Sequence, residues 1–201
     1  SFTVTTDRAN NPIIGGFTNS LSLGGVSKAF PLDIDAFVAK FDTNGNRLWT
    51  QLVDASYNGR SVALDSAGFV YVTGYTNSST NPVNTTDYNV FLAKFNATTG
   101  ARVWSRFFGV LFYDLARAIT IDAADNIYIA GDAKATFWDL RYETPKDFYS
   151  FIAKLDTNTG RKVGVLAAQH DHQPTRTDAA PGLFTPCRRG RLDRPIVHLE
   201  R

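Results

Sequence analysis

One stretch of the chain decides the fold: Ser61-Val62-Ala63-Leu64-Asp65-Ser66-Ala67-Gly68-Phe69-Val70-Tyr71-Val72-Thr73-Gly74, followed after a loop by Phe91-Leu92-Ala93-Lys94-Phe95-Asn96. Its first part is small and apolar, turns tightly between Asp65 and Gly68, and continues in β-branched and aromatic residues. Aspartate favours such turns because its side chain accepts backbone hydrogen bonds, and glycine tolerates positive φ. The second part alternates faces with period two. The stretch therefore predicts three antiparallel strands, joined by a tight turn and a long loop.

The same landmarks recur on both sides of this stretch. Aspartates at 7, 65 and 122 each stand nine residues before a glycine, and they are 58 and 57 residues apart. A Phe-x-Ala-Lys segment follows each time, and then a turn that ends in glycine. The residues that mark the repeat in this way are Phe37, Lys40, Trp49, Phe91, Lys94, Trp104, Phe151 and Lys154. A period of this length predicts units that stack on their neighbours to bury their apolar faces.

Each unit predicts four short antiparallel strands, and this pattern is typical of a β-propeller blade. We therefore expect an all-β fold of about three four-stranded blades, at about residues 1–58, 59–115 and 116–164. The repeat stops where Gly164 replaces the fourth-strand tryptophan, so residues 165–201 are a non-repeat C-terminal segment. Propellers normally close with about four to eight blades. We expect an incomplete propeller, part of something larger or completed by a partner.

Composition excludes several classes of protein. The 201 residues are 43% hydrophobic and 20% charged, so the chain is neither disordered nor a membrane bundle. The net charge of +2 is too small to indicate a nucleic-acid partner by itself. No apolar run reaches 18 residues, so we expect no membrane insertion. The single cysteine, Cys187, excludes a disulfide framework within the chain.

Two resemblances rest on these residues. Residues 63–78 and Asp35-Ala36-Phe37-Val38-Ala39-Lys40 resemble the SBBP family of seven-bladed β-propeller repeats. That resemblance implies a propeller in exported or cell-surface proteins, without family-wide catalytic residues. Residues 39–49 are more weakly similar to the tryptophan-docking repeats of quinoprotein dehydrogenases. That likeness implies that Trp49 and Trp104 join blade to blade, which is a structural role.

The repeated aspartates have two interpretations. Asp7, Asp65 and Asp122 would form a ring of carboxylates near the propeller axis, able to bind a cation such as Ca²⁺. We favour the other interpretation, in which each aspartate caps the turn of its own blade. No cofactor is expected beyond this option of Ca²⁺.

The function that we expect is non-catalytic, because no nucleophile and base stand at a known spacing. The chain is predicted to be an extracellular or cell-surface structural and interaction module, binding a protein partner or itself through open blade edges. The loops between second and third strands carry aromatic side chains suited to stacking on a glycan or peptide: Tyr75, Tyr88, Trp138 and Tyr142. A carbohydrate-binding propeller and a fragment of a quinoprotein-like dehydrogenase are the alternatives.

Overall fold

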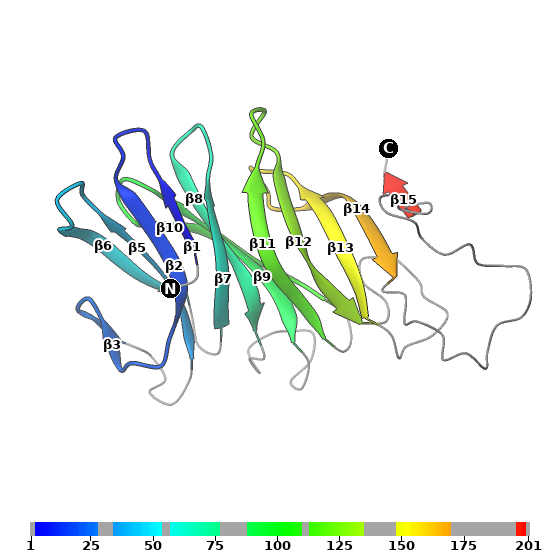
Figure 1. Ribbon diagram of the computed structural model, residues 1–201, viewed down its shortest axis with the longest axis horizontal. Coiled ribbons are helices and arrows are strands. Elements are labelled where there is room, and N and C mark those ends of the chain that lie inside the picture. The colour runs from blue at the N-terminus through cyan, green and yellow to red at the C-terminus, as the bar shows by residue number, and fades with distance from the viewer. Residues whose placement is uncertain are drawn as a thin grey trace, which may run out of the picture.

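The computed structural model describes residues 3–27, 34–53, 57–76, 88–109, 113–134, 148–169 and 196–199. Three antiparallel sheets lie side by side in a row (Figure 1). The first sheet has the order β1-β2-β5-β6, from β1 (Thr3–Thr6), β2 (Pro12–Thr18), β5 (Asp35–Phe41) and β6 (Arg47–Val53). A small hairpin, β3 (Ser22–Leu23) and β4 (Val26–Ser27), is inserted between β2 and β5.

The next two sheets repeat the plan of the first. The second sheet comprises β7 (Tyr57–Leu64), β8 (Phe69–Thr76), β9 (Asn89–Asn96) and β10 (Arg102–Phe108) in that order. The third comprises β11 (Asp114–Ile121), β12 (Ile127–Lys134), β13 (Phe148–Leu155) and β14 (Lys162–Gln169), and β15 (Ile196–Leu199) pairs with β14 as a fifth strand. The predicted all-β fold with four-stranded antiparallel blades is confirmed. The division of the chain into domains stays a prediction.

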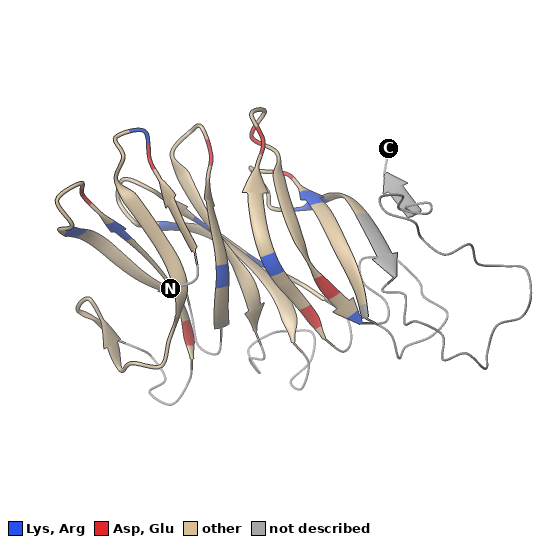
Figure 2. Ribbon diagram, in the orientation of Figure 1, with Lys and Arg blue, Asp and Glu red and all other residues tan. Residues whose placement is uncertain are grey.

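The turns between the first and second strands follow the sequence pattern closely. Gly68 has a φ of 83°, and Asn10 and Asp125 take the equivalent place with φ of 61° and 60°. Asn and Asp tolerate this left-handed conformation better than other residues with a side chain. The acidic residues of these turns gather at one end of the sheets (Figure 2).

The first strands of the second and third sheets each carry a β-bulge. The register shifts between Gly59 and Ser61 in β7 and between Ala116 and Ala118 in β11. One arginine therefore lies in each bulge, Arg60 and Arg117. Because a bulge leaves one residue unpaired and re-aims its side chain, both arginines leave the regular alternation of their strands.

The core lies in two layers between neighbouring sheets. One layer joins the first sheet to the second, through buried residues such as Ile13, Val38, Val62 and Phe91. The other joins the second to the third, through Tyr71, Leu92, Ile119 and Phe151. The first strands of the second and third sheets make most of these contacts. β7 contacts β1, β2 and β5, and β11 contacts β7, β8 and β9. Each layer therefore belongs to two blades at once.

Candidate functional site

The three repeated aspartates lie in the turns that follow the first strands. Asp7 Oδ1 accepts the backbone N–H groups of Ala9 and Asn11, each at 2.9 Å. Asp122 does the same with Ala124 at 2.9 Å and Asn126 at 2.8 Å. Asp65 accepts the N–H of Phe69 at 2.7 Å. Each carboxylate is thus engaged in its own turn.

These contacts set the acidity of the turn carboxylates. Burial acts to raise the pKa of Asp7, but hydrogen bonds from Lys40 and Asn11 outweigh it and hold that pKa well below its usual range. The side-chain and backbone hydrogen bonds of Asn126 lower the pKa of Asp122 in the same way. Within the described part of the chain, no three His, Cys, Asp or Glu side chains gather as a cation site.

A lysine joins the first sheet to the second. Lys40 is only 7% exposed, and its Nζ donates to the carbonyl oxygen of Ala97 at 2.9 Å while it pairs with Asp7 at 2.7 Å. Trp49 Nε1 donates to the same carbonyl at 3.1 Å. A Cβ on Gly100 would lie 2.9 Å from Cδ2 of Trp49, so the indole packs directly on this glycine, which has a φ of 74°. We call this set of contacts a clamp.

A second clamp joins the second sheet to the third at equivalent positions. Lys94 Nζ donates to the carbonyl oxygen of Thr157 at 3.0 Å, and the Tyr71 hydroxyl donates to it at 3.3 Å. Trp104 packs on Gly160, where a Cβ would lie 2.8 Å from Cη2 of the indole. A lysine that recurs in every repeat is expected from the sequence to pack through its aliphatic stem. The structure adds that the ammonium group binds the main chain of the next blade.

Burial shifts the pKa values of Lys94 and Tyr71 in the second clamp. Desolvation lowers the pKa of Lys94, although the nearby carboxylate of Asp65 opposes this shift. Desolvation raises the pKa of Tyr71, and its hydrogen bond to Asp65 adds to the effect. Tyr71 therefore stays a neutral donor to Asp65, at 2.9 Å, and to Thr157.

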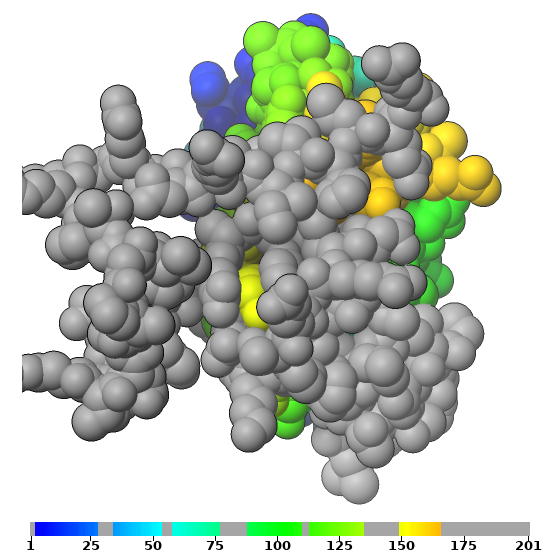
Figure 3. Space-filling view, turned by 90° about the vertical axis from the view of Figure 1, so that its right-hand side faces the viewer, coloured from blue at the N-terminus to red at the C-terminus, as the bar shows by residue number. Residues whose placement is uncertain are grey.

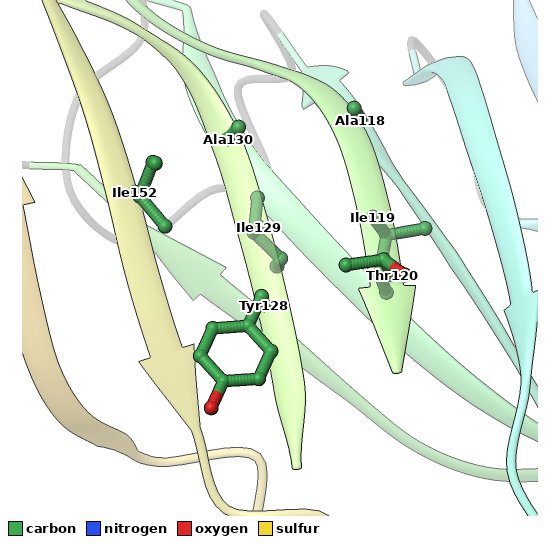
Figure 4. A pocket seen from close by; sticks show the side chains of 7 residues that line it. All are labelled: Ala118, Ile119, Thr120, Tyr128, Ile129, Ala130 and Ile152. Atoms are coloured by element: carbon green, nitrogen blue, oxygen red, sulfur yellow. The ribbon is translucent and has the colours of Figure 1, made fainter. Parts of the chain in front are cut away.

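On the outer face of the third sheet lies a third lysine, for which the described residues do not complete a clamp. Lys154 Nζ lies 5.8 Å from the ring centre of Tyr128, and both are partly exposed. A shallow, almost wholly apolar hollow of about 180 Å³ lies beside them (Figure 4). Its lining comprises Ala118, Ile119, Thr120, Tyr128, Ile129, Ala130 and Ile152. Figure 3 turns this end of the row toward the viewer.

Equivalent residues of the three repeats differ sharply in exposure at the two ends of the row. Val38 and Leu92 are 0% exposed, whereas Ile152 is 50% exposed. At the other end, Val62 and Ile119 are 5% and 8% exposed, whereas Val4 is 64% exposed. Val4 and Ile152 are therefore exposed at positions that are buried wherever two blades meet.

An aromatic cluster lies where the second strand ends and the third begins. The ring centres of Tyr75 and Tyr88 are 5.3 Å apart, and those of Tyr88 and Tyr113 are 5.0 Å apart. Arg60 donates to the Tyr75 hydroxyl at 2.6 Å, with its guanidinium 5.0 Å from that ring centre. Two of the four predicted loop aromatics, Tyr75 and Tyr88, thus come together. The other two, Trp138 and Tyr142, lie outside the described residues.

Arg60 was missed by the sequence reasoning, and Tyr113 was not assigned to this aromatic cluster. The position of Arg60 in the bulge gives the one signal that could have found it, because Arg117 recurs 57 residues later. Arg117 pairs with Asp132 at 2.7 Å, and Asp132 is the counterpart of Tyr75. Tyr113 carries no such signal, since it follows a segment that differs between repeats.

Three comparisons relate the chain to known proteins, and the match to a family model agrees with the repeat pattern. No curated protein matches the chain. A structure described as a protein of unknown function from Bacteroides caccae is 10% identical, with a TM-score of 0.43, and the match covers 81% of this chain. The chain spans 59% of the length of that protein. The model of the SBBP family, described as a beta-propeller repeat, matches residues 49–81. The chain therefore carries a beta-propeller repeat of the SBBP family at these residues.

Proposed function

We propose that the protein is a non-catalytic β-propeller scaffold, extracellular or on the cell surface, that binds a protein partner through the outer face of its third sheet. The observation that carries the proposal is Ile152, which is 50% exposed where Val38 and Leu92 are fully buried. Covering an apolar side chain stabilises a complex by about 25 cal/mol for each Å² removed from water. The location rests on the resemblance to exported propeller repeats.

The chemistry of the face indicates what a partner must offer. The hollow beside Ile152 is apolar, so the partner must present an aliphatic side chain there. Lys154 at its margin requires a hydrogen-bond acceptor, as Lys40 and Lys94 have in the carbonyls of Ala97 and Thr157. A sheet surface with a nearby turn meets both requirements.

Site-specific crosslinking tests this proposal. The photoreactive residue p-benzoylphenylalanine replaces Ile152 in the protein expressed in its own cells, and the matched control replaces Val103, which is 51% exposed on β10. We expect one defined adduct from position 152, identified by mass spectrometry, and its loss when Ala118→Arg is added to the face. No adduct, or the same adducts from both positions, would overturn the proposal.

A second candidate function is carbohydrate binding, and the aromatic cluster favours it. Tyr75, Tyr88 and Tyr113 form a continuous aromatic surface with Tyr113 41% exposed, and Arg60 supplies a donor beside it. Sugar rings stack on such surfaces. A glycan array should show a signal that Tyr113→Ala removes and Tyr128→Ala keeps. An array without any signal excludes this candidate. No contact among the described residues favours the dehydrogenase alternative.

A further inference from the structure

The chain contains the dipeptide Asn-Gly twice, in contrasting surroundings. Asn44-Gly45 lies in the turn that joins β5 to β6 at the tip of the first sheet (Figure 1), and Asn58-Gly59 lies within β7. Both residues of the first pair are exposed, whereas Gly59 is buried. The two pairs have the same covalent chemistry, so any difference in their reactivity comes from the fold.

We propose that Asn44 is a site of spontaneous deamidation, at which the folded protein converts a neutral amide to aspartate or isoaspartate, and that the fold protects Asn58. This modification is independent of the proposed function, because it concerns the free turn of the first sheet.

The reaction needs only the main chain, a base and water. The backbone nitrogen of Gly45 gives up its proton to base and bonds to Cγ of Asn44, while the bond from Cγ to the side-chain nitrogen breaks and ammonia leaves. Water then opens the succinimide ring at either of its two carbonyl carbons. A carboxylate therefore replaces the amide, either on a normal main chain or on one that runs through Cβ, and nothing is oxidised or reduced.

The surroundings of Gly45 leave room for this attack. Nothing lies within 4 Å of the position that a Cβ on Gly45 would take, whereas its counterparts Gly100 and Gly160 each lie against an indole. Glycine also changes its backbone angles more freely than any other residue. The turn can therefore reach the geometry of the ring without moving a neighbouring side chain.

The hydrogen bonds that hold the turn lie at the surface. The N–H of Gly45 donates to the carbonyl oxygen of Asp42 at 3.1 Å, and the N–H of Asn44 donates to Asp42 Oδ1 at 2.9 Å in an exposed setting. Turn tips with few buried contacts open locally at a low cost in free energy. The nitrogen of Gly45 is thus released for part of the time in the folded protein.

The second pair is held in the ladder between β7 and β8. Asn58 pairs with Tyr75, and Gly59 pairs with Gly74. Gly59 lies so close to the carbonyl oxygen of Gly16 in the first sheet that a Cβ would not fit. The ring cannot form unless this part of the strand leaves the ladder, and such an opening costs more free energy than the opening of a turn.

A third asparagine separates the effect of an open turn from the effect of the following glycine. Asn158 lies at the equivalent turn of the third sheet, is exposed, and donates its N–H to Asp156 Oδ1 at 3.1 Å. The next residue is Thr159, whose branched Cβ crowds the attacking nitrogen. Asn158 should therefore convert more slowly than Asn44, although both are exposed.

Incubation of the 201-residue chain at mildly alkaline pH tests the proposal. Peptide mapping by mass spectrometry measures the converted fraction of each asparagine, and electron-transfer fragmentation distinguishes isoaspartate from aspartate. In the folded chain, Asn44 should convert about tenfold faster than Asn58 and Asn158, or more. In urea, where the ladder is lost, Asn58 should reach the rate of Asn44 because glycine follows both.

Ion exchange gives an independent readout, since conversion adds one negative charge. The acidic species that forms in the wild-type chain should be absent from Asn44→Ser and present in the matched control Asn158→Ser. Equal rates at Asn44 and Asn58 in the folded chain would overturn the proposal. An Asn44 that stays intact in the folded chain while both pairs convert in urea would overturn it as well.

Discussion

The outer faces of the second and third sheets have almost the same strand plan and opposite surroundings. Leu92 is fully buried and Lys94 is 6% exposed on the second sheet, whereas Ile152 is half exposed on the third. The residue types at these positions are nearly interchangeable. The comparison teaches that the neighbouring blade, and not the strand itself, decides whether a position belongs to the core. Three pairs of substitutions test this conclusion.

The largest expected effect comes from truncating the two equivalent aliphatic residues. Leu92→Ala should lower the free energy of unfolding by about 3 kcal/mol, because it leaves a cavity between two sheets. Ile152→Ala should cost less than about 1 kcal/mol, since its side chain is half in water. Urea denaturation of the purified protein measures both values. Equal losses would contradict the comparison.

The second effect concerns the turn glycines. Gly100→Ala should cost about 2–4 kcal/mol, because alanine is strained at a φ of 74° and its Cβ would press on Trp49. Gly45→Ala should cost only about 1–2 kcal/mol, the conformational part alone, since nothing lies within 4 Å of its Cβ position.

The difference in melting temperature between these two variants isolates the contact with the indole. Gly68→Ala is a second control, with a φ of 83° and open space around it. A Gly100 variant that melts together with both controls would show that the indole does not press on this turn.

The smallest effect is a dependence on pH at the first clamp. The pKa of Asp7 is lowered in the fold, so its ionised form stabilises the protein. This contribution is complete above the unfolded pKa of about 3.9 and is lost as the pH falls toward the lower folded value.

Asp7→Asn tests this pH dependence. The variant should cost about 1 kcal/mol at neutral pH, because an uncharged amide replaces the partner of Lys40. It should also flatten the fall in stability in acid, measured by urea denaturation between neutral pH and pH 3. Asp122→Asn removes a carboxylate whose pKa is lowered mainly by the hydrogen bonds of Asn126, so this variant measures how much of the flattening such turn hydrogen bonds cause. A wild-type curve with the same slope as that of Asp7→Asn would refute the contribution of Asp7.

The repeat in the sequence was sufficient to predict the sheets. The spacing of Asp65, Gly74 and the Phe-x-Ala-Lys segment predicted three strands in the right order, because turn chemistry and period-two alternation act locally. The same pattern predicted the family of repeat that matches residues 49–81. Asp7, Asp65 and Asp122 lie at equivalent turns for the same local reason.

The repeat pattern in the sequence could not predict the contacts between blades. The sequence does not distinguish a lysine that only packs through its aliphatic stem from one, such as Lys40, that also binds the carbonyl of Ala97. The acceptor is a main-chain atom 57 residues away, so no side chain marks it. Likewise, nothing in the letters of Val38, Leu92 and Ile152 distinguishes the one that lies open. Such information exists only in the packing of whole sheets.

The acceptor in each clamp has a consequence for how such chains evolve. Lys40 and Lys94 bind backbone carbonyls, at Ala97 in one case and Thr157 in the other, and the ring of the tryptophan rests on a glycine. The turn that accepts the lysine must keep its backbone shape, but its side chains are not constrained, since every residue carries a backbone carbonyl. A blade that is duplicated or exchanged by recombination therefore joins its new neighbour without compensating mutations at residue 97 or 157, and copy number changes more easily than blade design.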